Sequence, residues 1–190
     1  MRKSPLAIGI SDVTKELEKH KEQFAKCINA TCSDFAKSGP GWVSQEVTKV
    51  YGIKPSDFKT QYRGYTKAGK IKIGHVPIDN IKLRYSGRTL TIKHFGMTPT
   101  QIPKRKPYKV SAAVFKGRKK MVSSKAFIAT ANNSTLAWKR VGRDRMPIRP
   151  VKTLSAPQMV TSQYTEIPIQ RRISYNLVKR WDHHVDRFNK

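Results

Sequence analysis

The sequence predicts an α+β protein in which N-terminal helices precede a mostly antiparallel β-sheet and a C-terminal helix. Apolar residues recur at steps of three and four near both ends of the chain, as in amphipathic helices. Between these ends, short runs alternate apolar with basic or polar residues, as in half-buried strands. The 190 residues suit a single domain with a helical part (1–62), a basic sheet (63–155) and a helical C-terminal part (156–190).

The first helix is predicted from one apolar stripe that ends at a helix-breaking triplet. Gly39-Pro40-Gly41 is expected to stop this helix, because proline lacks the N–H that a helix interior needs. A second helix is expected over residues 42–51, followed by a short helical turn at 54–58 with Pro55 at its start. The stripe consists of Val13, Leu17, His20, Phe24, Cys27/Ile28, Thr31 and Phe35.

The two cysteines lie on this first helix. Cys27 and Cys32 are five residues apart, and helix neighbours on one face are three or four apart. The geometry therefore argues against a disulfide between them. We expect both to be reduced, with Cys27 near the buried face.

The strands are predicted in the middle of the chain from alternation at period two. Gly87-Arg88 is expected to join two of them, and residues 117–120 to form a basic hairpin tip. One face of the resulting sheet would be apolar and the other basic. The predicted strands cover residues 70–74, 80–86, 89–95, 108–117, 120–130 and 135–141.

The last helix is predicted from a stripe spaced by steps of four, four, four and three. It begins near Pro168, and such a helix normally packs on a sheet or on a neighbouring subunit. Its apolar members are Ile173, Leu177, Trp181, Val185 and Phe188.

The charge of the chain is concentrated in the predicted sheet. The chain has 39 Lys+Arg against 12 Asp+Glu, a formal net charge of +27, and 24 of the basic residues fall within residues 51–150. Nucleic acid is the expected partner, and an anionic membrane is the weaker alternative. Helix-turn-helix, zinc-finger and RNP-type motifs are missing from the sequence, so we predict contact with phosphates without sequence readout. The predicted DNA-binding residues are Lys104, Arg105, Lys106, Lys109, Lys116, Arg118, Lys119, Lys120, Lys139, Arg140, Arg143, Arg145 and Arg149.

Enzymatic, metal-binding and membrane-spanning roles find no support in the sequence. The five histidines show no ligand spacing, and we interpret them as solvated or half-packed. The aspartates of the middle region are too few for metal-assisted cleavage of nucleic acid. The sequence shows no nucleotide-binding loop, no secretory signal and no run of apolar residues long enough to cross a bilayer. We therefore expect no catalytic residues, no metal and no cofactor.

An ordered set of weak motifs covers roughly residues 20–185. Residues 47–59 form a predicted helix followed by Tyr51-Gly52-Ile53-Lys54, and residues 86–96 form a hairpin that begins Ser86-Gly87-Arg88. Further motifs are Phe127-Ile128-Ala129, Trp138-Lys139-Arg140, Gly142-Arg143, Met146-Pro147-Ile148 and Ala156-Pro157 through Met159. In this order, the motifs resemble the signature of the prophage minor tail protein Z family. The Pro- and Lys-rich loop from Gly96 to Tyr108 does not align with the family pattern.

The resemblance implies a structural virion protein of a tailed phage, located at the head-proximal end of the tail and in the host cytoplasm during assembly. It implies long helices flanking a strongly curved antiparallel sheet, assembled as a ring that is expected to be a hexamer. The implied partners are tail terminator or tail tube proteins, head-completion or connector proteins, the tape measure protein and double-stranded DNA. Such a ring needs apolar helix faces between subunits, and the predicted oligomer interface consists of Phe24, Ile28, Phe35, Ile173, Leu177, Trp181, Val185 and Phe188.

The basic, proline-containing stretch after residue 139 fits the same picture. Its arginines would face DNA or acidic neighbours, and Pro147 and Pro150 would keep the segment extended and out of edge pairing. Its apolar residues Val141, Met146, Ile148 and Val151 would pack inward. A free nucleic-acid-binding protein, associated with ribosomes or the nucleoid, is the alternative that charge alone supports.

Overall fold

The computed structural model describes residues 5–60, 62–66, 82–104, 107–131 and 133–188; for 5–17, 62–66 and 82 it describes the backbone alone. The chain divides into two compact units. The helical unit comprises the described residues within 1–39, 65–83 and 172–190. The sheet unit comprises those within 40–64 and 84–171. These units do not follow the three predicted parts, because each unit combines segments that are distant in the sequence.

The first helix, α1 (Pro5–Val50), continues through the triplet that was expected to stop it. The predicted break at Gly39-Pro40-Gly41 is therefore wrong, although the two units divide between Gly39 and Pro40. An internal proline costs a helix about 3 kcal/mol, which tertiary burial can offset. Phe35 is buried in the helical unit, and Val43 and Val47 are buried in the sheet unit.

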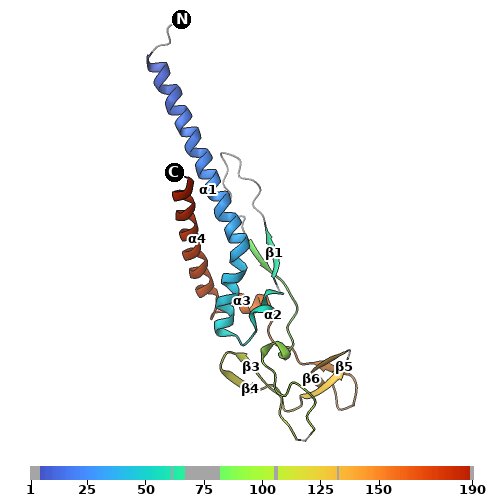
Figure 1. The fold of residues 1–190 in the computed structure, drawn as a ribbon. Coiled ribbons are helices and arrows are strands. Elements are labelled where there is room, and N and C mark those ends of the chain that lie inside the picture. Colours follow the sequence, from blue (N-terminus) through green and yellow to red (C-terminus); the bar gives the residue numbers. More distant parts are fainter. Residues whose placement is uncertain (1–4, 61, 67–81, 105–106, 132, 189–190) are drawn as a thin grey trace. The chain divides into compact units, whose positions relative to one another are not determined.

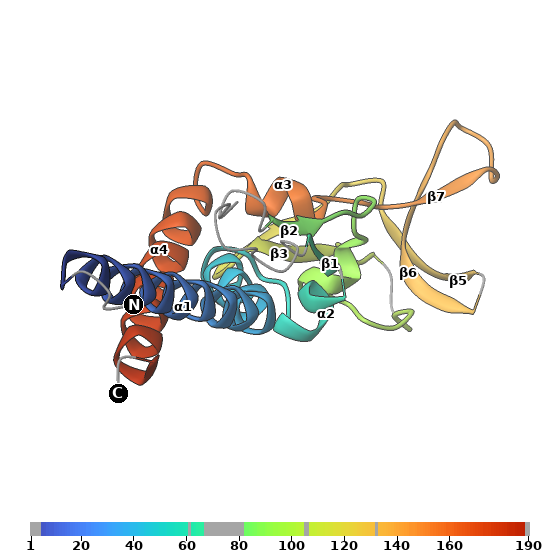
Figure 2. The same ribbon diagram turned by 90° about the horizontal axis from the view of Figure 1, so that it is seen from above.

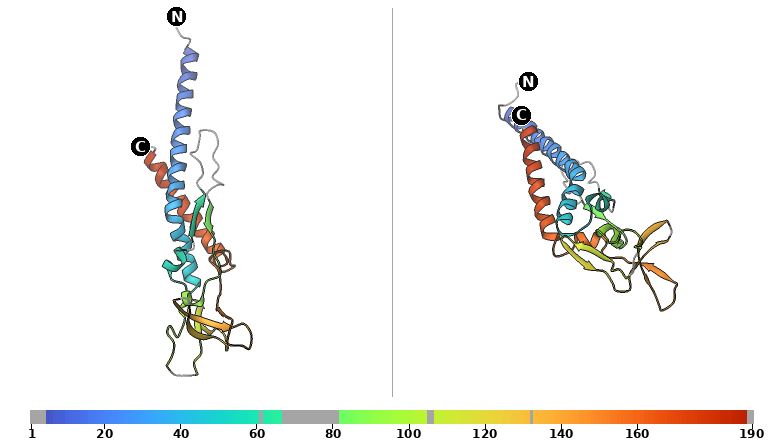
Figure 3. Two further views of the ribbon diagram at one scale, coloured as in Figure 1. Left: turned by 90° about the vertical axis from the view of Figure 1, so that its right-hand side faces the viewer. Right: turned by 60° about the horizontal axis from the view of Figure 1, so that its bottom comes forward.

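In the helical unit, α1 lies beside the last helix, α4 (Glu166–Phe188), and the two run in opposite directions (Figures 1 and 3). The Gln23 side-chain amide donates to the Phe188 carbonyl over 3.3 Å near one end of the contact. Phe35 and Ile173 line one groove near the other end. The two predicted stripes thus meet in the folded chain, where together they cover apolar surface that neither helix could bury alone.

The sheet unit contains small sheets instead of the single continuous sheet that the alternation predicted. Strand β3 (Ser111–Phe115) pairs antiparallel with β4 (Arg118–Met121). A second sheet has the order β5 (Phe127–Ala131), β6 (Ser134–Arg140), β7 (Ile148–Pro150), all antiparallel (Figure 2). Strand β1 (Tyr62–Thr66) pairs with β2 (Lys82–Tyr85) in a separate two-stranded sheet, part of which belongs to the helical unit.

Two predicted strands have a different structure. Residues 92–95 of the 89–95 run form a 3₁₀ turn, η2 (Ile92–Phe95), in which Ile92 and Phe95 are buried. The 120–130 run is split between β4 and β5, because residues 122–126 pass between the two sheets. The predicted strand at 70–74 lies outside the described residues.

The core of the sheet unit lies where these small elements meet. Ile92 of η2, Ala112 of β3 and Ile128 of β5 belong to one buried cluster with Ala137 of β6. The Tyr108 hydroxyl packs against this cluster and accepts a hydrogen bond of 2.9 Å from the Ile128 backbone N–H. Buried polar groups need such partners, so this bond fixes β5 against the preceding loop.

Two short helices complete the sheet unit. The predicted turn at 54–58 is confirmed as α2 (Pro55–Lys59), with proline at its first position. Helix α3 (Ala156–Val160) begins at Ser155, which forms a reciprocal capping box with Gln158. The prediction of a mixed α+β fold with antiparallel strands is therefore confirmed at that level.

Candidate functional site: the basic surface and the helix pair

The β3–β4 hairpin carries the densest group of predicted DNA-binding residues. Arg118, Lys119 and Lys120 lie within strand β4, so the prediction that they form the hairpin tip is wrong. The turn itself contains Lys116 and Gly117, and Gly117 has a φ of 73° that glycine adopts without strain. All four residues of β4 are exposed, because this strand has a solvent-facing edge.

The β6–β7 pair carries a second group of cations. Lys139 and Arg149 are register partners on neighbouring strands. Arg140 places its guanidinium 5.7 Å from the centroid of the Phe127 ring and donates a hydrogen bond of 3.3 Å to the Asp144 carbonyl. These contacts hold Arg140 close to the sheet. Lys139 and Arg149 form no side-chain hydrogen bond or ring contact with the described residues.

Eleven of the thirteen predicted DNA-binding residues are described, and every one of them is exposed. Arg105 and Lys106 lie outside the described residues. Within the described part of the chain, none of the eleven forms an ion pair with a carboxylate. Their charges are therefore available to an anionic partner.

The apolar residues beside these cations do not all pack inward as predicted. Val141 is 51% exposed and Met146 is 64% exposed, whereas Val151 is buried. Pro150 pairs with Trp138 in β7, which is an edge strand of its sheet. That the prolines keep this edge from pairing with a further strand stays a prediction. A three-residue edge strand tolerates proline because proline lacks an N–H, and at an edge position the missing group would only have faced solvent.

The predicted interface residues of the helices contact each other within one chain. The rings of Phe24 and Trp181 meet edge to face with centroids 5.3 Å apart. Ile28 and Phe35 are buried, and with Ile173, Leu177 and Trp181 they line an apolar groove of about 360 Å³. Val185 and Phe188 are half-buried. That these residues also contact a neighbouring subunit stays a prediction.

Replacing Trp181 with Ala should destabilise the helical unit by about 2 kcal/mol. The cost should fall below the 3–5 kcal/mol typical of a fully buried ring, because Trp181 is half-buried and Phe24 beside it is 51% exposed. Urea denaturation followed by circular dichroism would measure it. A near-neutral result would mean that α4 does not depend on this contact.

A polar cluster that the sequence did not predict lies in the same helix pair. The buried His184 places Nε2 3.1 Å from Asp34 Oδ2, and Arg180 Nη1 lies 3.7 Å from the same oxygen. The interpretation of all histidines as solvated or half-packed is therefore wrong for His184. The seven-residue separation of Cys27 and Asp34 places them on one face of α1, but no local pattern could indicate that His184 packs there.

The Cys27 thiol belongs to this cluster but is not arranged as a nucleophile. Its Sγ donates to the His184 carbonyl oxygen over 3.6 Å, so the bond goes to the backbone and not to the imidazole. Burial raises the pKa of Cys27, and a backbone hydrogen bond opposes part of that rise. Burial also raises the pKa of Cys32. Both are free thiols, and a raised pKa disfavours the thiolate that reacts.

The rate of alkylation should differ between the buried Cys27 and the half-buried Cys32. Cys32, which is half-buried, should react with iodoacetamide before Cys27, and both should react more slowly than the same thiols in the urea-unfolded chain. Because each folded pKa is raised, folding stability should fall as the pH rises above the ordinary thiol pKa, where only the unfolded thiols ionise. Mass spectrometry of the alkylated protein would measure the order of reaction, and urea denaturation across that pH range would measure the stability.

Within the described residues, no group of three or more His, Cys, Asp or Glu side chains is placed to hold a metal ion. None of the described helices is both long and apolar enough to cross a membrane. Comparison of the chain with protein-family models, with curated protein sequences and with solved structures finds no match in any of the three.

Proposed function

We propose that this protein is a structural component of a tailed phage particle that completes the head-proximal end of the tail, as a ring, and contacts DNA through its sheet unit. The observation that carries the DNA contact is the exposure of eleven predicted cations without carboxylate partners in the described chain. The tail role rests on the ordered motifs between residues 20 and 185, and the two parts of the proposal are tested separately.

The chemistry of the basic surface suits DNA of any sequence. Lysine and arginine side chains on short antiparallel strands release condensed counterions when they contact phosphates, and this term carries no sequence information. The described residues form no base-reading helix of the helix-turn-helix or zinc-finger kind. A protein that surrounds or guides a passing genome needs this kind of contact, since every sequence must pass.

Antibody-gold electron microscopy of the phage particles, or of particles from the induced lysogen, tests the tail role. Label at the head–tail joint is the expected result. A protein that is missing from the particles and recovered with soluble nucleic acid would support the second candidate, a free nucleic-acid-binding protein, which the exposed cations favour equally.

Sedimentation of the purified protein tests the ring. A defined oligomer, formed alone or on tail tubes, is expected. Monomers that never enter particles would count against the ring. The DNA contact would then be tested separately, by the salt dependence of DNA binding.

A further inference from the structure

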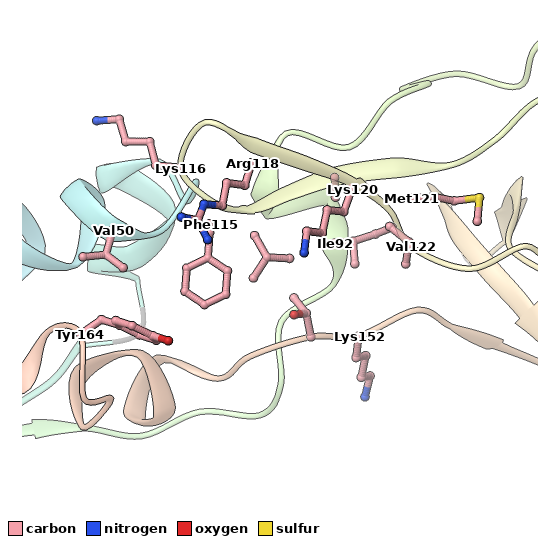
Figure 4. A pocket seen from close by; sticks show the side chains of 13 residues that line it. Val50, Ile92, Phe115, Lys116, Arg118, Lys120, Met121, Val122, Lys152 and Tyr164 are labelled. Atoms are coloured by element: carbon pink, nitrogen blue, oxygen red, sulfur yellow. The ribbon is translucent and has the colours of Figure 1, made fainter.

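The sheet unit contains a cavity of about 680 Å³ whose walls combine aromatic rings with cations. Its floor is formed by Ile92 and Ala112, both of which are buried. Its upper wall in Figure 4 is the β3–β4 hairpin, and its opposite wall is the segment that leads from Lys152 to Tyr164. A volume of this size lies within the range typical of small-ligand sites.

Two aromatic rings in this cavity are exposed. Phe115 is 38% exposed and Tyr164 is 54% exposed, and their rings meet at 85° with centroids 5.7 Å apart. The Phe115 ring also packs against the buried Tyr51 ring, with centroids 5.3 Å apart and ring planes inclined by 32°. The Phe115 and Tyr164 rings present surface that the described chain does not cover.

The cations at this cavity are placed by strand alternation. Lys120 is the register partner of Ala112, so both belong to the face of the hairpin that forms the cavity wall. Arg118, two residues before, lies on the same face of β4. Figure 4 shows the Arg118 and Lys120 side chains extending toward the cavity. Lys119, between them, donates instead to Thr98 Oγ1 over 2.8 Å and does not line the cavity.

We propose that this cavity binds an unpaired segment of nucleic acid, with a base stacked on Tyr164 beside Phe115 and the flanking phosphates held by Arg118 and Lys120. The inference rests on the proposed nucleic-acid contact and adds a preference for single strands over duplex. Alternate residues of β4 are about 7 Å apart, a separation comparable to that of successive phosphates in an extended strand.

The rings distinguish this occupant from an acidic peptide. Arginine and lysine would attract either polyanion, but a carboxylate chain gains little from exposed ring faces. A base stacks on such faces whatever its identity, which suits a site without hydrogen-bonded base readout. In duplex DNA the base faces are covered by their neighbours, so duplex could use the cations but not the rings.

Fluorescence anisotropy with a labelled oligo(dT) and a duplex of the same length tests the stacking. Tyr164→Leu should weaken oligo(dT) binding by about 5- to 150-fold. Tyr164→Phe keeps the ring and should retain affinity. Tyr175→Leu, which removes a more exposed tyrosine on α4, is the control and should change nothing. None of the three variants should alter duplex binding.

The cation placement has its own matched pair. Lys120→Gln should weaken oligo(dT) binding more than Lys119→Gln, although both remove one exposed charge from β4. An oligonucleotide of abasic sites keeps the phosphates and should bind Tyr164→Leu and the unaltered protein equally. Equal losses for Lys119→Gln and Lys120→Gln would overturn the assignment of the phosphates to this cavity.

The outcomes separate this inference from the proposed function. Equal affinity for oligo(dT) and duplex, with no effect of Tyr164→Leu, would reject the single-strand site and leave the DNA contact intact. Failure to bind either probe would reject both. Stronger binding of an oligoglutamate peptide than of oligo(dT), lost in Tyr164→Leu, would assign the cavity to an acidic protein segment and overturn the inference.

Discussion

Changing Arg118, Lys119 and Lys120 together to Gln is expected to leave the sheet unit folded and to reduce DNA binding strongly. All three side chains are exposed on β4, and the bond from Lys119 to Thr98 is a solvent-exposed hydrogen bond of the kind that contributes about 1 kcal/mol or less. If all three contact phosphates, the slope of log K against log salt should become shallower by about 3. If the two affinities converge at about 1 M salt, this slope difference corresponds to an affinity loss of roughly 500- to 1,000-fold at about 0.1 M salt.

The matched control removes the same charge from elsewhere in the same unit. Lys54, Lys59 and Lys125 are exposed, belong to the sheet unit and are not among the predicted DNA-binding residues. Changing these three to Gln should reduce affinity much less. Equal losses in both triple variants would show that net charge, and not the β4 surface, attracts DNA. An insoluble β4 variant would indicate that this strand is an assembly contact instead.

Changing Gly52 to Ala is expected to destabilise the sheet unit by more than about 3 kcal/mol. The Gly52 N–H donates to the Val114 carbonyl over 3.0 Å, which brings the backbone after α1 against β3. A Cβ at this position would lie 2.0 Å from the Ala113 carbonyl oxygen. That oxygen belongs to the backbone of β3 and cannot move aside without breaking the contact. A lowered midpoint of urea unfolding would measure the effect.

Gly41 provides the control for the same substitution. It lies within α1 in the same unit, and a Cβ there would meet nothing within 4 Å. Alanine is a better helix former than glycine by up to about 1 kcal/mol, so Gly41→Ala should be neutral or stabilising. If Gly52→Ala were equally harmless, the approach of Gly52 to β3 would not be needed for folding.

The basic surface could be predicted from composition, but its division into sites could not. The eleven described cations are exposed as their charge predicts, but not by alternation, since Arg118, Lys119 and Lys120 are consecutive and all exposed. Which cations share a face with an aromatic ring depends on the β3–β4 register and on a bulge between Ala112 and Phe115. Tyr164 comes from a different part of the chain, so no local period could associate it with Lys120.

For the helix pair too, the sequence predicted which residues lie on one helix face but not which residues on the two helices meet. The stripes that contain Phe24 and Trp181 could be predicted from the sequence, because residues on one face of a helix recur every three or four positions. The pairing of Asp34 with His184 joins residues 150 positions apart, and it depends on how α1 and α4 pack in the folded chain.

The sequence by itself determined the mixed α+β class, the amphipathic stripes, the short α2 turn and the excess of basic charge in the middle of the chain. Each of these is local or additive, so neighbouring residues are sufficient to specify it. The tertiary structure alone decided that α1 continues through Pro40, that residues 92–95 form a buried turn, and that cations and rings meet at one cavity. These outcomes depend on burial against segments that are distant in the sequence. The free energy of that burial exceeds the local conformational preferences of the residues involved.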